Sequence, residues 1–135
     1  MTNLPGSADL PAGWEPVLQD VWALKDRCVA LTGILGLTAQ SHRRVEIAST
    51  DRYQGGREIL LSSGLTVAEI EAIRLTEAER RYYDALYVFR LVLLAVQEHL
   101  SRFLVLQRRG ELAAAREVIA ICRLRIADVI REQFP

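Results

Sequence analysis

The 135-residue sequence has few residues of the types that point to a particular chemistry. It contains two cysteines, one methionine and a single lysine, Lys25, and only 7% of its residues are aromatic. Its 17 basic and 17 acidic side chains cancel, which argues against a protein that binds nucleic acid or an anionic membrane through net charge. No stretch approaches the roughly 18 uncharged apolar residues of a membrane-spanning helix. With 50% hydrophobic and 25% charged residues, the composition is that of one globular domain.

Neither the cysteines nor the N-terminus indicates secretion. Cys28 and Cys122 match no CxxC motif or zinc-ligand spacing, and two thiols do not form a disulfide framework. The N-terminus lacks the basic start and the continuous apolar stretch of a signal peptide. We therefore expect a cytoplasmic protein with both cysteines buried and reduced, a flexible leader over residues 1–14 and a single helical domain over residues 15–135.

Apolar and small residues recur at alternating spacings of three and four, which is the period of amphipathic helices. One run predicts a helix over 16–48, a second predicts a long helix from 77 to about 108, and a third predicts a final helix that ends near Gln133. Gly33 and Gly36 interrupt the first run. The first helix is therefore expected to bend or break there, or to meet another backbone closely.

Shorter helix signals lie between these runs. The sequence contains two capping-box patterns, Thr66–Glu69 and Thr76–Glu79. In a capping box the threonine side chain accepts from the backbone N–H of the glutamate three residues later, and the glutamate side chain accepts from the backbone N–H of the threonine. The first box predicts a short helix over 67–74, and the second begins the long helix at 77. One or two helical turns are also expected over 57–62.

The predicted fold class is all-α, an elongated antiparallel bundle of three long helices and one short helix. The long helix from 77 is apolar around most of its circumference, so it requires burial on both faces. Straight helices of about 33 residues would be roughly 50 Å long, more than the diameter of about 36 Å of a compact globule of this size. We therefore expect either a broken first helix or a core shared with a second copy, most simply in a C2 dimer.

The sequence contains no phosphate loop, nucleophile elbow, HExxH motif or Glu-x-x-His pair, so no enzyme class, cofactor or metal is predicted. The favoured hypothesis is a non-enzymatic bundle, an adaptor or accessory subunit, that self-associates and docks a protein partner. One alternative is a small-molecule sensor or enzyme with an inter-helix pocket bounded by Arg90, Tyr83, Tyr87 and His42. Another is a nucleic-acid accessory protein that uses the arginines Arg108, Arg109, Arg116 and Arg123.

Most of the charged residues also have a structural explanation. His42 is followed one helical turn later by Glu46, which would hold the imidazole near a helix end. The paired carboxylates at 69/71 and 77/79 fall in first helical turns, where the helix dipole favours them. Arginines with an acid four residues away form solvated faces, and no basic run is interleaved with aromatic residues, which weakens the nucleic-acid alternative.

Arg90 is the strongest single candidate for a binding role, because it is the only charge in residues 85–96. A guanidinium stays protonated, so burial without a partner would cost several kcal/mol. Three environments remain open: the side chain extends to water along its stem, it binds an anionic ligand, or it pairs with a carboxylate of another helix or subunit. The acids considered for such a pair are Asp26, Glu46 and Asp128.

Replacing Arg90 with methionine distinguishes these environments. Unchanged stability and assembly are expected for an exposed guanidinium, and a large loss of stability for an inter-helix pair whose acid is left unpaired. A gain in stability together with loss of partner or ligand binding is expected for a functional site. Urea unfolding and light scattering of the variant provide the measurements.

Overall fold

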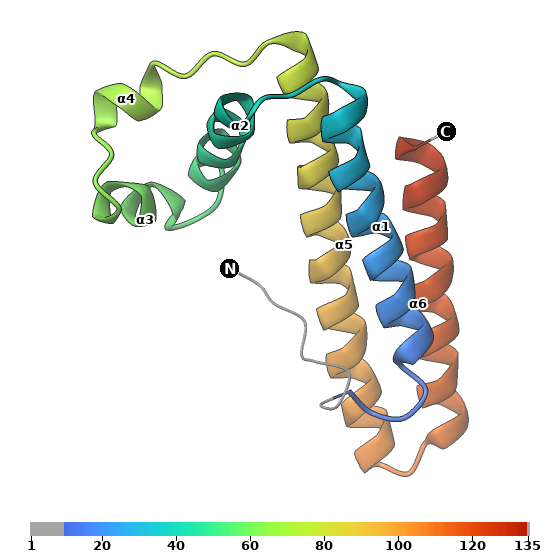
Figure 1. Ribbon diagram of the computed structural model, residues 1–135. Helices are drawn as coiled ribbons and strands as arrows, with labels where there is room; N and C mark the ends of the chain where they lie inside the picture. The colour runs from blue at the N-terminus through green and yellow to red at the C-terminus, as the bar shows by residue number, and fades with distance from the viewer. Residues whose placement is uncertain (1–9, 135) are drawn as a thin grey trace. The chain divides into compact units, whose positions relative to one another are not determined.

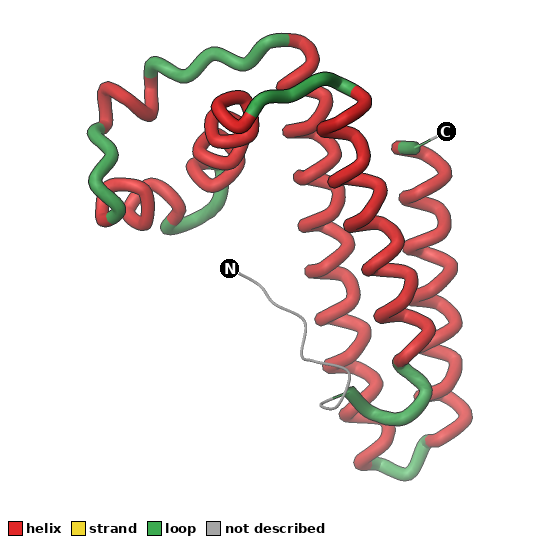
Figure 2. Tube along the Cα trace, viewed as in Figure 1, coloured by secondary structure: helices red, strands yellow, loops and turns green. Residues whose placement is uncertain are grey.

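The computed structural model describes residues 10–134, and every regular element in that range is an α-helix (Figure 1, Figure 2). This part of the chain is therefore all-α, as the periodicity predicted. The helices are α1 (Glu15–Ile34), α2 (Ala39–Asp51), α3 (Gly56–Ser62), α4 (Val67–Glu71), α5 (Glu77–Arg108) and α6 (Leu112–Gln133). None of these described helices has both the length and the apolar character that crossing a membrane requires.

The described chain divides into two compact units, and both α1 and α5 contribute to each of them. The first unit comprises residues 10–26 and 88–134. The second comprises residues 27–87, and thus holds the end of α1, the helices α2, α3 and α4, and the beginning of α5. Each unit has its own buried side chains.

In the first unit, α6 runs antiparallel to the adjoining part of α5, and the beginning of α1 lies along this hairpin (Figure 1). Trp14, the last residue of the predicted leader, is only 1% exposed, and its ring meets that of Phe103 edge-on with centroids 5.5 Å apart. Arg123 of α6 donates to Asp20 of α1, with 2.9 Å between Nε and Oδ2. The apolar core of this unit consists of Trp14, Val17, Val21, Leu24, Val92, Val96, Phe103, Ala115, Val118, Cys122 and Ile126.

In the second unit, the apolar core is smaller and two polar side chains are buried within it. The buried side chains are Cys28, Val45, Ser49, Leu60, Ile70, Glu79, Tyr82 and Ala85. The thiol of Cys28 donates to the carbonyl oxygen of Ala85 at 3.8 Å, which links α1 to α5. The prediction that both cysteines are buried is confirmed, and burial raises the pKa of Cys28 and of Cys122 to about 11.

The first predicted helix, over 16–48, is broken near the two glycines, which is one of the outcomes that the sequence left open: α1 ends at Ile34 and α2 begins at Ala39. The break lies at Gly36, which adopts a left-handed conformation with φ of 65° that favours glycine over other residues. Thr38 then caps α2, since its hydroxyl oxygen accepts from the backbone N–H of Ser41 at 3.1 Å. The apolar pattern runs through this junction because both helices bury a face, and the spacing alone does not reveal a change of backbone direction.

Both capping boxes are present at the predicted positions. Thr66 accepts from the N–H of Glu69, whose carboxylate accepts from the N–H of Thr66, and Thr76 and Glu79 repeat the arrangement with both distances between 3.0 and 3.1 Å. The first box begins α4, which is shorter than predicted because it ends at Glu71. The predicted fold counted one short helix, whereas the described chain has three shorter ones: α2 comes from the broken first helix, and α3 corresponds to the helical turns expected over 57–62.

Gly56 and Gly33 form a matched pair for testing this fold. A Cβ added at Gly56 would lie 1.8 Å from the carbonyl oxygen of Thr50, so Gly56→Ala must displace the backbone that joins α2 to α3. We expect a loss of about 2–4 kcal/mol in the free energy of unfolding. Gly33 is helical and has no atom within 4 Å of an added Cβ, so Gly33→Ala should instead stabilise by about 0.5–1 kcal/mol. Urea unfolding of both variants measures this, and equal effects would contradict the described α2–α3 junction.

Candidate functional site

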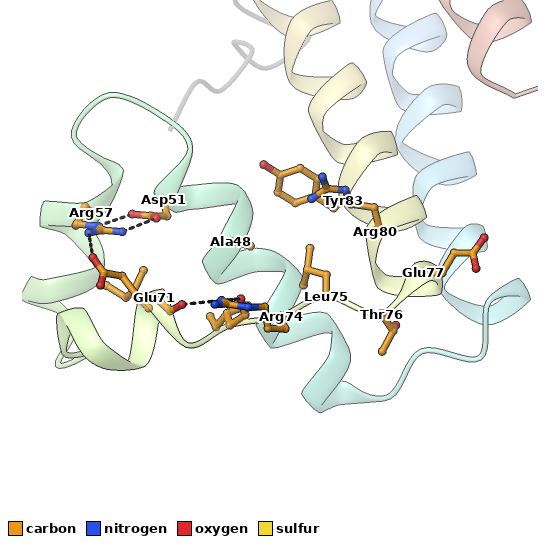
Figure 3. Close-up of a pocket in the computed structure, with 12 residues that line it drawn as sticks. Ala48, Asp51, Arg57, Glu71, Arg74, Leu75, Thr76, Glu77, Arg80 and Tyr83 are labelled. Atoms are coloured by element: carbon orange, nitrogen blue, oxygen red, sulfur yellow. Dashed lines mark hydrogen bonds and ion pairs between the residues drawn. The ribbon is translucent and has the colours of Figure 1, made fainter.

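The second unit contains a pocket of about 600 Å³ bounded by α2, α3, α4, the segment 72–76 and the first turns of α5 (Figure 3). This volume is within the range of roughly 300–1,000 Å³ that small-molecule sites occupy. Part of its lining is apolar and part is charged. The apolar lining residues are Ala48, Ile70, Ile73 and Leu75.

One end of the pocket is closed by Arg57. Its guanidinium binds both oxygens of Asp51 at 2.9 Å and one oxygen of Glu71 at 3.1 Å (Figure 3). The neighbouring guanidinium holds the pKa of Asp51 below its usual value. Arg57 of α3 is therefore bonded to the last residues of α2 and α4, and each of its three nitrogens already donates to a carboxylate.

Tyr83 and Arg80 lie at the other end of the pocket, on the first turns of α5. The guanidinium of Arg80 lies over the Tyr83 ring, 5.4 Å from its centroid (Figure 3). Arg52, at the C-terminal end of α2, donates to the Tyr83 hydroxyl at 3.4 Å and lies 3.6 Å from the centroid of Tyr87. The result is a ladder in which two arginines alternate with two tyrosines, and we call these four residues the arginine–tyrosine ladder.

The structure brings together two of the predicted ligand residues, Tyr83 and Tyr87, but it adds Arg52 and Arg80, which sequence reasoning missed. Arg80 could have been identified from the sequence, since it precedes Tyr83 by three residues and so shares a helix face with it. Arg52 could not have been identified in this way, because it lies at the end of α2 and both tyrosines lie on α5. Arg90 belongs to the first unit, where it is half-buried and has an interaction partner, and it lines neither of the two pockets described here.

His42 has the structural role that its spacing to Glu46 suggested. Its Nδ1 lies 3.3 Å from the Glu46 carboxylate, and its Nε2 lies 2.9 Å from the hydroxyl oxygen of Tyr82. The Tyr82 phenol is buried, which raises its pKa. His42 thus links α2 to α5 and does not line the pocket beside Tyr83.

A buried ion pair lies close to this link. Glu79 is 1% exposed, and its Oε2 accepts from Nη2 and Nε of Arg44 at 2.5 and 3.2 Å. Its Oε1 accepts from the backbone N–H of Thr76, so both carboxylate oxygens are bonded. These bonds, above all the one from Arg44, lower the pKa of Glu79 to about 2. A carboxylate that is ionised and fully bonded in this way stabilises the fold and is unsuited to proton transfer near neutral pH.

The first unit exposes apolar side chains on its hairpin. Leu91 and Leu94 of α5 and Ile121 and Leu124 of α6 are between 44% and 66% exposed. A groove of about 230 Å³ lies between the same two helices, and Leu91, Val92, Cys122 and Arg125 are among its lining residues. We call Leu91, Leu94, Ile121 and Leu124 the hairpin face.

The arginines considered for nucleic-acid binding lie in the first unit as well. Arg108 is the last residue of α5, Arg109 follows it in the turn, and Arg116 lies in the second turn of α6; all three are exposed. Arg123 is held by Asp20 and so already has a carboxylate partner. Across residues 10–134, no three His, Cys, Asp or Glu side chains are grouped as ligands for a metal ion.

Compared with known proteins, the chain matches no family model, no curated protein and no solved structure.

The low pKa of Glu79 makes stability depend on pH. The carboxylate is ionised down to about pH 2 when folded, whereas its ordinary pKa is 4.5. It therefore contributes about 2 kcal/mol above pH 5, and this contribution is lost as the pH falls towards 2. We expect Glu79→Gln to be less stable than the unmodified protein at neutral pH and the difference to shrink in acid. The exposed neighbour Glu77→Gln is the control, and an unchanged difference in urea unfolding between neutral pH and pH about 3 would contradict the assignment.

Proposed function

We propose that the protein is a non-enzymatic helical interaction protein, an adaptor or accessory subunit, that self-associates through the hairpin face of its first unit. The observation that carries this proposal is the exposure of the four apolar side chains of that face, of which Leu91 also lines the groove between α5 and α6. Contiguous apolar surface beside a groove is typical of protein–protein interaction sites. The most economical assembly is a C2 dimer within an antiparallel helical bundle.

The positions along each helix support a single continuous face. Successive residues of a helix are rotated by about 100°, so Arg123 and Ile121 flank the buried Cys122 on opposite sides. Arg123 reaches Asp20 of α1, and Ile121 therefore lies on the side of α6 that faces away from α1. On α5, Leu91 immediately precedes the buried Val92, as Ile121 precedes Cys122 on α6, and Leu91 also lines the groove.

The dimensions and charges of this surface suit a second copy of the chain. The 22 residues of α6 extend over roughly 33 Å, and two adjacent helices are roughly 20 Å wide. The area of one side of the hairpin therefore approaches the area of about 800 Å² that each partner buries in a standard interface. Arg125 and Glu132 both line the groove and are two helical turns apart. If α6 pairs antiparallel with its copy, Arg125 of each chain would lie opposite Glu132 of the other chain, so the two-fold symmetry would give two ion pairs.

The alternatives have less support from the described residues. Arg90, the centre of the predicted small-molecule site, lines neither the pocket of the second unit nor the groove between α5 and α6. A nucleic-acid interface would rest on the exposed Arg108, Arg109 and Arg116 alone, since Arg123 is held by Asp20. Neither alternative explains why leucines and an isoleucine are exposed along two helices.

Light scattering at low micromolar concentration tests the proposal. We expect a mass twice that of the 15.2 kDa chain, and a monomer when Leu94 and Leu124 are both replaced by lysine, because a charge in each apolar patch opposes its burial. The control is Ile34→Lys, which alters the most exposed of the large apolar residues outside the hairpin face. A monomeric unmodified protein, or dissociation by Ile34→Lys to the same extent, would overturn the proposal.

A further inference from the structure

We infer that the pocket of the second unit binds an organic anion, a compact apolar or aromatic molecule that carries one carboxylate, sulfonate or phosphate group. Arg80 would bind the anionic group, with Arg74 as the second cation at the rim of the pocket. This inference does not depend on self-association, because the residues that carry it all lie between Arg27 and Tyr87.

The charges that line the pocket are unequally paired. Arg57 is bonded to both Asp51 and Glu71, so one cation uses two of the three lining acids. The third acid, Glu77, points away from the other lining side chains (Figure 3).

Neither Arg74 nor Arg80 forms an ion pair with a carboxylate of residues 10–134. Arg74 donates instead to the carbonyl oxygens of Glu71 and Ile73, at 2.8 and 3.0 Å. Arg80 has only its contact with the ring of Tyr83. Two guanidinium groups at one pocket therefore lack an anionic partner.

The arginine–tyrosine ladder holds the key donor in place. Arg80 lies over one aromatic ring, and the hydroxyl of that ring is bonded by Arg52, whose guanidinium lies over Tyr87. Stacking uses the face of a guanidinium and leaves its N–H groups, which point outward in its plane, free to bind an anion in a bidentate manner. The ring contact restricts the side chain of Arg80, so less conformational entropy is lost when an anion binds.

The other lining residues favour a ligand whose uncharged part is apolar or aromatic. Ala48, Ile70, Ile73 and Leu75 provide an apolar surface, and the Tyr83 ring adds an aromatic edge. A bare inorganic ion would leave most of the 600 Å³ unfilled, and a nucleic acid would need many more phosphate contacts than two arginines provide. The pocket therefore suits a small amphipathic acid.

Anilinonaphthalene sulfonate is a probe of this class, since it joins an aromatic body to one sulfonate and becomes fluorescent when bound. We expect it to saturate a single site on the unmodified protein and to bind about tenfold more weakly to Arg80→Gln, through loss of a charge-assisted hydrogen bond. Arg74→Gln should weaken binding in the same direction. The matched control is Arg81→Gln, because Arg81 is the exposed neighbour on α5 and does not line the pocket.

A neutral probe separates charge recognition from apolar adsorption. Phenylnaphthylamine has the same aromatic body without the sulfonate, so its binding should be equal in the unmodified protein and in Arg80→Gln. The double variant Leu94→Lys with Leu124→Lys should retain the sulfonate site whether or not it dissociates. Circular dichroism confirms that each variant is folded, and Arg80 and Arg74 are exposed enough for both variants to fold.

Three results would overturn the inference. The first is equal weakening by Arg80→Gln and Arg81→Gln, and the second is no weakening by either Arg80→Gln or Arg74→Gln. The third is loss of sulfonate binding in the Leu94 and Leu124 double variant, which would place the probe on the hairpin face.

Discussion

The second unit depends on the buried contact between Arg44 of α2 and Glu79 of α5. Glu79 serves two purposes at once, because one oxygen completes the capping box with Thr76 and the other binds the guanidinium. The start of α5 and its attachment to α2 are thus fixed by the same carboxylate. Residues that follow on α5, including Tyr82 and Tyr83, then meet His42 and Arg52 of α2.

A buried ion pair is a costly way to join two helices, since both charges lose water. The cost is offset here because every oxygen of Glu79 is bonded and Arg44 remains partly accessible to solvent. An apolar pair of similar volume would hold the helices together as well, but it would not fix where α5 begins. The ion pair therefore contributes specificity of register to a unit whose apolar core is small.

The helices that the sequence predicted best are those in which local signals and burial agree. The helix α5 begins at its capping box and ends beside a left-handed Gly110, and α6 follows at once, as the spacing indicated. The sequence did not decide between a bend and a break at Gly36, because a glycine inside an apolar run is compatible both with a bent helix and with the end of a helix. Only the backbone geometry, with a left-handed Gly36 followed by a threonine cap, distinguishes them.

The candidate site was less predictable, because its contacts join residues far apart in sequence. Tyr83 and Tyr87 were identified from their position on one helix, but the partner of both, Arg52, lies 31 residues before Tyr83. Arg57 likewise bonds acids 6 and 14 residues away, outside the spacing of three or four that a helix surface pairs. A sequence shows which side chains can form ion pairs, and the fold decides which of them do.

This unequal pairing explains how a pocket lined by equal numbers of acids and arginines can hold two guanidinium groups that have no carboxylate partner. Each ion pair occupies an acid with a guanidinium, and Arg57 alone occupies two acids, Asp51 and Glu71. No ion pair with a carboxylate of residues 10–134 offsets the positive charge of Arg74 or of Arg80. Local charge in such a protein is set by which acids the fold has already used, and the net charge of the chain gives no measure of it.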